Sequence, residues 1–197
     1  MQMPTILYLH GMASSHESNT AAYIRKYMPD ATVLAPDLSI DPSVAFPQID
    51  KILAEQQIDL IVGHSLGGFM AQKYRGYRKV LINPSLGVSY FNLLKGTNHY
   101  KHARYDGIQT WYVDERICKE YKQIELHQYD NLPPEEDALT IGMFAWWDVV
   151  TRMSSHWFKQ HYTQRYFMPG LHFPSEKTVC NYIVPAIRKL LKVKGER

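Results

Sequence analysis

A serine stands between two glycines in the segment Gly63-His64-Ser65-Leu66-Gly67, which fits the pattern Gly-x-Ser-x-Gly. The apolar run 60–62 before it is typical of a buried parallel strand. This context predicts a nucleophile elbow, a sharp turn from strand to helix that presents the serine hydroxyl. Free N–H groups and the helix dipole would favour negative charge at that point. The alternative is a glycine-rich turn with an ordinary serine.

A serine hydroxyl is a weak nucleophile at neutral pH and needs a base, which in turn needs a carboxylate to orient it and stabilise its cation. His172 follows the last expected strand, and Asp148 ends the strand before it. The order Ser65, Asp148, His172 is the order of nucleophile, acid and base expected after such an elbow. Asp37 also ends a strand, but it precedes the serine in the chain. We therefore predict Asp148 as the acid and keep Asp37 as the alternative.

The surroundings of these residues suggest further roles. Two backbone N–H groups would form an oxyanion hole, those of Leu66 and of Met12 in the loop after the first strand. A simple tight turn after that strand is the alternative. We expect His10 to be a structural hydrogen-bonding residue beneath this loop. The neighbouring indoles of Trp146 and Trp147 are expected to keep water away from Asp148.

The elements that would position these residues alternate along the chain. Strands are expected over 5–9, 32–35, 60–62, 79–82, 139–145 and 164–168, and helices over 18–28, 43–56, 66–75, 149–158 and 175–191, the last kinked at Pro185. This alternation predicts one α/β domain over residues 1–197, with about six parallel strands and helices on both faces. The functional residues would gather at the carboxyl ends of the strands.

The alternation is interrupted over residues 85–137, which are polar and rich in tyrosine and tryptophan. A helix is expected over 117–126. A stretch of this length is either a functional excursion such as a lid or a solvated surface insertion, and the sequence leaves both open. Its aromatic residues offer walls with polar tips rather than a long apolar trough, which favours substrates with short acyl chains.

Composition narrows the class of protein. The chain has 197 residues and a net charge of +3, and its basic C-terminal residues 188–197 are typical of a solvated helix end rather than a nucleic-acid patch. Cys118 and Cys180 form no metal or redox motif. The N-terminus shows no signal peptide, and no apolar run approaches the ~20 residues that span a bilayer. We expect a cytoplasmic protein that needs no metal or organic cofactor and binds neither nucleic acid nor membrane.

Several segments together resemble the α/β-hydrolases and, more narrowly, the small YqiA-type esterases. They are Leu7-Tyr8-Leu9-His10-Gly11 followed by Ser14-Ser15, the elbow 63–68, Ile82-Asn83-Pro84, and the segments around Asp148 and His172. The family's usual Gly-Asp-Glu-Val around the acid stands here as Trp147-Asp148-Val149-Val150. The resemblance implies a single-domain hydrolase acting on esters or thioesters with short acyl groups.

These observations predict a serine esterase that cleaves a small-molecule carboxylic ester through an acyl-enzyme. A thioesterase or an acyltransferase with the same three residues is a second possibility. A non-catalytic binding protein on a hydrolase scaffold is a third, because a fold does not fix a function. The oligomeric state is left open.

Overall fold

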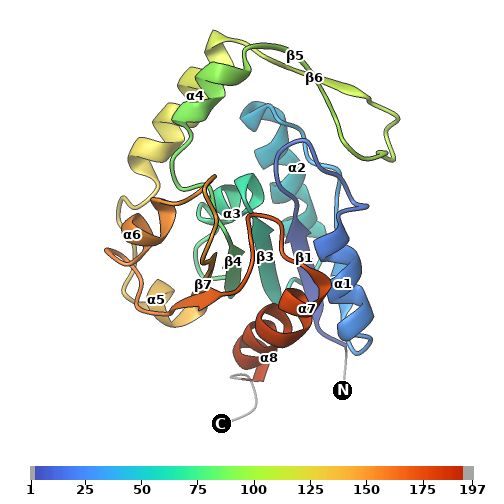
Figure 1. Ribbon diagram of the computed structural model, residues 1–197, viewed down its shortest axis with the longest axis vertical. Helices are drawn as coiled ribbons and strands as arrows, with labels where there is room; N and C mark the ends of the chain where they lie inside the picture. The colour runs from blue at the N-terminus through green and yellow to red at the C-terminus, as the bar shows by residue number, and fades with distance from the viewer. Residues whose placement is uncertain (1–2, 193–197) are drawn as a thin grey trace.

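The computed structural model describes residues 3–192 of the chain (Figure 1). Six strands form one sheet in the order β2-β1-β3-β4-β7-β8, and every neighbouring pair is parallel. The strands are β1 (Thr5–Leu9), β2 (Thr32–Leu34), β3 (Leu60–His64), β4 (Lys79–Ile82), β7 (Thr140–Ala145) and β8 (Arg165–Met168). The expected single α/β domain with six parallel strands is confirmed.

Side chains of the sheet alternate between two cores, because successive residues of a strand point to opposite faces. Ile6 and Tyr8 of β1 belong to one core, and Leu7 and Leu9 belong to the other. The first face is covered by α1 (Asn19–Tyr27) and the C-terminal helix α8 (Val184–Lys192), and the second by α2 (Pro42–Glu55) and α3 (Leu66–Ala71). The helices therefore cover both faces, as expected.

Three expected helices differ from the structure. The helix expected over 66–75 ends at Ala71, as α3. Residues 149–158 form only the short α6 (Ser154–Phe158), because the backbone N–H groups of Val150 and Thr151 turn back to the carboxylate of Asp148 instead of continuing a helix. The closing helix is divided into α7 (Glu176–Thr178), a π-helical turn η2 (Val179–Ile183) and α8. Pro185 lies two residues after this π-turn, and its nitrogen carries no hydrogen to donate to a carbonyl of the preceding turn.

Residues 85–137 have a structure of their own. They contain a 3₁₀ turn η1 (Ser89–Leu94), an antiparallel hairpin of β5 (Gly96–His99) and β6 (Thr110–Val113), and α4 (Glu115–His127), and α5 (Glu135–Leu139) begins at their end. Phe91, Trp111 and Tyr121 are buried in the same core as α2 and α3. The interpretation as a solvated surface insertion is therefore wrong, because this segment supplies part of the hydrophobic core.

The loop that joins β5 to β6 reaches across the molecule to the loop after β1 (Figure 1). The N–H of Lys101 donates to the carbonyl of Ala13 at 3.0 Å. The N–H of Tyr105 donates to a carboxylate oxygen of Asp37 at 2.6 Å, and the Tyr105 ring stacks on His16. The hairpin loop is thus attached to the carboxyl edge of the sheet.

Within residues 3–192, no helix has both the length and the apolar character required to cross a membrane. Residues 1–2 and 193–197, which include part of the basic C-terminal segment, lie outside the described residues.

Candidate active site

Ser65 lies between β3 and α3 in a conformation that few residues adopt, with φ +54° and ψ −117°. A Cβ on Gly63 would lie 2.5 Å from the carbonyl oxygen of Gly67, and one on Gly67 would lie 2.1 Å from that of Leu9. Any side chain at either position would collide with backbone, so both glycines are needed for this turn. The expected sharp turn from strand to helix is present, and it is strained at the serine.

Three side chains from separate strand ends form one hydrogen-bonded chain. The Oγ of Ser65 lies 2.9 Å from Nε2 of His172, and Nδ1 of His172 lies 2.8 Å from Oδ2 of Asp148. All three residues are buried. With Nδ1–H donating to the carboxylate, Nε2 is the acceptor that faces the serine hydroxyl. This arrangement can take a proton from Ser65.

The carboxylate of Asp148 is held by more than the histidine. The hydroxyl of Thr151 donates to Oδ2 at 2.5 Å, and the N–H groups of Val150 and Thr151 donate to Oδ1. Burial alone would raise the pKa of Asp148, but the hydrogen bonds from His172 and Thr151 outweigh it and lower the pKa to about 2. Asp148 is therefore ionised at neutral pH.

The expected shielding of Asp148 by two tryptophans is wrong. The side chains of Trp146 and Trp147 point to solvent and are 59% and 62% exposed. They lie in the turn after β7, in which Asp148 and Thr151 are the buried residues. Local hydrogen bonds from the turn itself, rather than apolar cover, fix the carboxylate.

A buried asparagine holds the loop that carries His172. The side-chain amide of Asn83 donates to the carbonyl of His172 at 2.8 Å, and its Oδ1 accepts from the N–H of Ala145 at 2.7 Å. Asn83 has φ +42°, a left-handed conformation that asparagine tolerates better than most residues. It thus connects the ends of β4 and β7 to the histidine loop. This role of Asn83 was not predicted from the sequence, although its position between a strand and Pro84 was a usable signal of a structural role.

The histidine inside the elbow has a different role from His172. Nε2 of His64 lies 2.9 Å from the carbonyl oxygen of His172 and can only donate there. Burial lowers the pKa of His64 to about 4. His64 is thus neutral at pH 7 and supports the histidine loop. Ser85, another residue without an assigned role in the sequence, has its Oγ 3.2 Å from that of Ser65.

The expected oxyanion donors lie on the two segments next to the serine. Leu66 is the first residue of α3 and directly follows Ser65. Gly11, which precedes Met12, is packed so closely that a Cβ there would lie 3.2 Å from Cβ of Ser65. His10 supports this loop, because its Nε2 accepts from the N–H of Leu38 at 2.9 Å, and burial lowers its pKa to about 4.

Asp37, the alternative acid, is engaged elsewhere. Its carboxylate accepts from the backbone and ring of His16 and from the N–H of Tyr105. Burial opposes ionisation of Asp37, but these hydrogen bonds prevail and lower its pKa. The structure brings Asp148 to the histidine and joins Asp37 to the hairpin loop.

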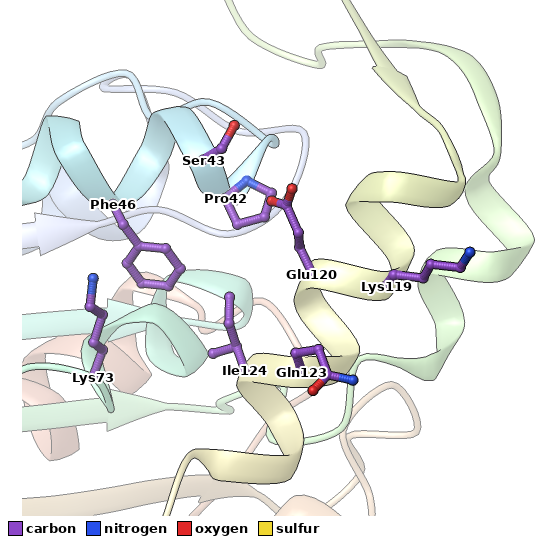
Figure 2. Close-up of a pocket in the computed structure, with 8 residues that line it drawn as sticks. All are labelled: Pro42, Ser43, Phe46, Lys73, Lys119, Glu120, Gln123 and Ile124. Carbon is purple, nitrogen blue, oxygen red and sulfur yellow. The ribbon is translucent and has the colours of Figure 1, made fainter.

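Two pockets differ in their relation to these residues. A pocket of about 430 Å³, which we call the loop pocket, is lined by the loop after β1, the start of α1, Lys101, His102 and residues 173–175. A second pocket of about 470 Å³ lies between α2 and α4, with Phe46 and Ile124 at its base (Figure 2). Ser65, Asp148 and His172 line neither pocket, but the loop pocket includes Gly11 and Met12 of the loop beside Ser65, and Phe173, which follows His172.

Comparison with known proteins supports the fold. The sequence profile of an uncharacterised protein family, UPF0227, matches residues 5–139. The mouse α/β-hydrolase domain-containing protein 10 superposes with a TM-score of 0.66 at 13% identity, over 98% of this chain and 91% of that one. A monoacylglycerol lipase from Paleococcus ferrophilus gives a TM-score of 0.64 at 14% identity, over 96% and 94%. The esterase domain of a Rhodothermus marinus protein gives 0.63 at 14% identity, over 98% and 87%. The chain has the α/β-hydrolase fold.

Proposed function

We propose that this chain, which belongs to the UPF0227 family, is a serine hydrolase that cleaves carboxylic esters through an acyl-enzyme. The observation that carries the proposal is the unbroken series of hydrogen bonds from Ser65 through His172 to Asp148. The lipase and the esterase domain with the same fold add support by analogy.

In the proposed reaction, Oγ of Ser65 attacks the ester carbonyl while Nε2 of His172 takes its proton. The ionised Asp148 stabilises the imidazolium that forms, which its low pKa favours. His172 then returns the proton to the departing alcohol, leaving an acyl group on Ser65. Water, deprotonated by the same histidine, releases the acid in the second half of the cycle.

The negative charge of each tetrahedral intermediate would be stabilised by the N–H groups of Leu66 and Met12. The N–H of Leu66 suits this role because Leu66 is the first residue of α3. The N–H of Met12 suits it because the preceding residue, Gly11, packs closely against Ser65. The chain's own residues supply the nucleophile, the base, the acid and the oxyanion donors in this scheme. We propose that substrates carry short acyl groups, because the aromatic residues of segment 85–137 are largely committed to core packing and do not form a long apolar channel.

Labelling with a fluorophosphonate and turnover of 4-nitrophenyl acetate test the proposal. Ser65→Ala should abolish labelling and lower kcat by about 10⁶, as the loss of a triad nucleophile does, while the fold survives because alanine fits the turn. Ser39→Ala, at a serine bonded to the backbone of residue 41, is the matched control and should still be labelled. Wild-type turnover in a clean Ser65→Ala preparation would refute the mechanism.

Product analysis with competing acceptors separates related activities. An esterase releases the free acid when an alcohol or a thiol is present. A predominance of the transferred acyl product would identify an acyltransferase, and a strong preference for thioesters over matched oxygen esters would identify a thioesterase. An unlabelled, inactive wild-type chain would favour a binding protein on this scaffold.

A further inference from the structure

The loop pocket lies next to both segments of the proposed catalytic machinery. Gly11 and Met12 form one part of its wall, and Phe173, which directly follows His172, forms another. The close contact of Gly11 with Ser65 places this wall beside the nucleophile. The third part of the wall is the hairpin loop, whose Lys101 is fixed to Ala13 by a backbone hydrogen bond of 3.0 Å.

The lining of this pocket carries a cation and no carboxylate. Its lining includes Lys101 and His102 but no aspartate or glutamate. Lys101 has no carboxylate within ion-pair distance among residues 3–192. Its ammonium group lies 5.7 Å from the centre of the Phe173 ring, at the rim of the pocket. An unpaired ammonium group beside an enclosed volume favours an anion there.

The remaining lining combines apolar and polar side chains. The hydroxyl and amide groups come from Ser14, Ser18, Asn19, Thr20 and Ser175. The apolar walls come from Met12, Ala13, Tyr23, Phe173 and Pro174. Apolar walls together with hydrogen-bonding groups and a cation fit an organic group that carries an oxyanion.

The position of the pocket indicates which half of an ester it would receive. In the proposed reaction His172 must reach the oxygen of the departing alcohol to return its proton. The pocket is lined by the next residue in the chain, Phe173. The alcohol portion is therefore the part of the substrate that extends toward Lys101.

We propose that the loop pocket binds a carboxylate or phosphate on the alcohol portion of the ester, so that anionic esters are preferred over neutral ones. This inference rests on the proposed esterase function and specifies its substrate class. Lys101 is the specificity-determining residue.

Matched acetate esters test this preference. 4-Acetoxybenzoate and 4-acetoxybenzamide share the acyl group and differ in the charge of the alcohol portion, and 4-acetoxyphenyl phosphate replaces the carboxylate by a phosphate. We expect kcat/KM of the wild type to be about two- to fivefold higher for an anionic ester than for the amide, the size of one exposed charge contact. The carboxylate and phosphate arms show which oxyanion the pocket prefers. The ratio should fall as NaCl increases.

Substitutions locate the preference in the pocket. Lys101→Met, which keeps the contact with Phe173, should reduce the ratio of anionic to neutral kcat/KM toward one, and Lys101→Arg should retain it. Lys119→Met removes an exposed cation that lines the pocket in Figure 2 and should leave the ratio unchanged. A ratio near one in the wild type, or one that Lys101→Met does not alter, overturns this inference and leaves the esterase function intact.

Failure of the proposed function has a different signature. If none of the three esters shows turnover that depends on Ser65, the esterase function is overturned. Calorimetric titration with 4-acetoxybenzoate then decides the pocket separately. Binding that Lys101→Met weakens supports the anion site, and the absence of binding, or binding that ignores the substitution, overturns it.

Discussion

The parallel sheet and segment 85–137 place their functional groups in different ways. In the sheet, strand pairing fixes where each strand ends, and the three residues of the hydrogen-bonded chain lie within four residues of the ends of β3, β7 and β8. Segment 85–137 adds core side chains such as Phe91 and Tyr121 to the same domain. Its hairpin loop is positioned by a few polar contacts, to Asp37, to Ala13 and, through Arg104, to the carbonyl of Leu38. The chemistry depends on the rigid part, and the surroundings of the substrate depend on the attached part.

Among substitutions that compare the two regions, the largest effect should follow when the carboxylate of Asp148 is neutralised. Asp148→Asn is expected to lower kcat on a short neutral ester by about 10⁴, because an amide neither stabilises the imidazolium nor fixes the required tautomer. Asp130→Asn, at an exposed carboxylate that bonds His127 in segment 85–137, is the matched control and should change kcat little. Steady-state kinetics of both variants on one ester decides the assignment. A mild effect of Asp148→Asn would contradict it.

The second prediction tests whether segment 85–137 belongs to the core. Phe91 is 1% exposed and stacks on Tyr121, with ring centroids 4.2 Å apart. Phe91→Ala should lower the free energy of unfolding by about 3–5 kcal/mol, measured by urea denaturation. Leu93→Ala, at a side chain 86% exposed in the same 3₁₀ turn, should cost little. A loss below about 1 kcal/mol for Phe91→Ala would mean that the segment packs independently of the sheet.

The same contrast explains what the sequence could and could not predict. Short apolar runs separated by helical patterns predict a parallel sheet, and strand ends then select Ser65, Asp148 and His172 for one edge. Segment 85–137 lacks such a period, because its buried aromatics come from a turn, a hairpin and a helix that meet only in the folded state. Its burial depends on contacts between residues distant in sequence, which no local pattern encodes.

Near the site, the sequence missed contacts made by side chains with backbone. The turn after Asp148 was expected to be helical, but the carboxylate accepts from the N–H groups of Val150 and Thr151. The role of Asn83 requires knowledge that three strand ends converge on it. The exposure of Trp146 and Trp147 also depends on this turn, since their hydrophobic character alone indicated burial.

A third prediction concerns the loss of folding stability at acidic pH, which should arise from the sheet region rather than from segment 85–137. His10 and His64 are buried there with pKa values of about 4, whereas His99, His102 and His127 of the segment are exposed. An unfolded histidine titrates near 6.5, so between pH 6.5 and 4 the unfolded chain binds more protons and stability falls as pH falls. At pH 5 each buried histidine should cost about 2 kcal/mol relative to pH 7.

Urea unfolding at pH 7 and at pH 5 measures this loss. Asp148, with a pKa of about 2, keeps its stabilising charge over this interval and loses it only at lower pH. His10→Asn should reduce the difference between the two pH values, and His102→Gln, at an exposed position, should not. Equal stability at pH 7 and pH 5 would show that the buried histidines do not control the acid response.

The smallest effect should come from the contact between the two regions. Asp37→Asn removes the charge that accepts from His16 and from the N–H of Tyr105, and it should lower the free energy of unfolding by about 1 kcal/mol. Local opening of the hairpin loop should be affected more than global unfolding, because few other contacts hold this loop to the edge of the sheet. Hydrogen exchange of residues 100–109 should therefore accelerate, while exchange in β3 and β4 stays slow. Asp30→Asn, which weakens an exposed ion pair with Arg188, is the control and should leave exchange in the hairpin loop unaltered.

Hydrolysis of a short neutral ester by Asp37→Asn should change less than tenfold, since Asp37 does not contact Ser65 or His172. A loss of kcat as large as that of Asp148→Asn would instead make Asp37 the acid and reverse the division of roles between the two aspartates.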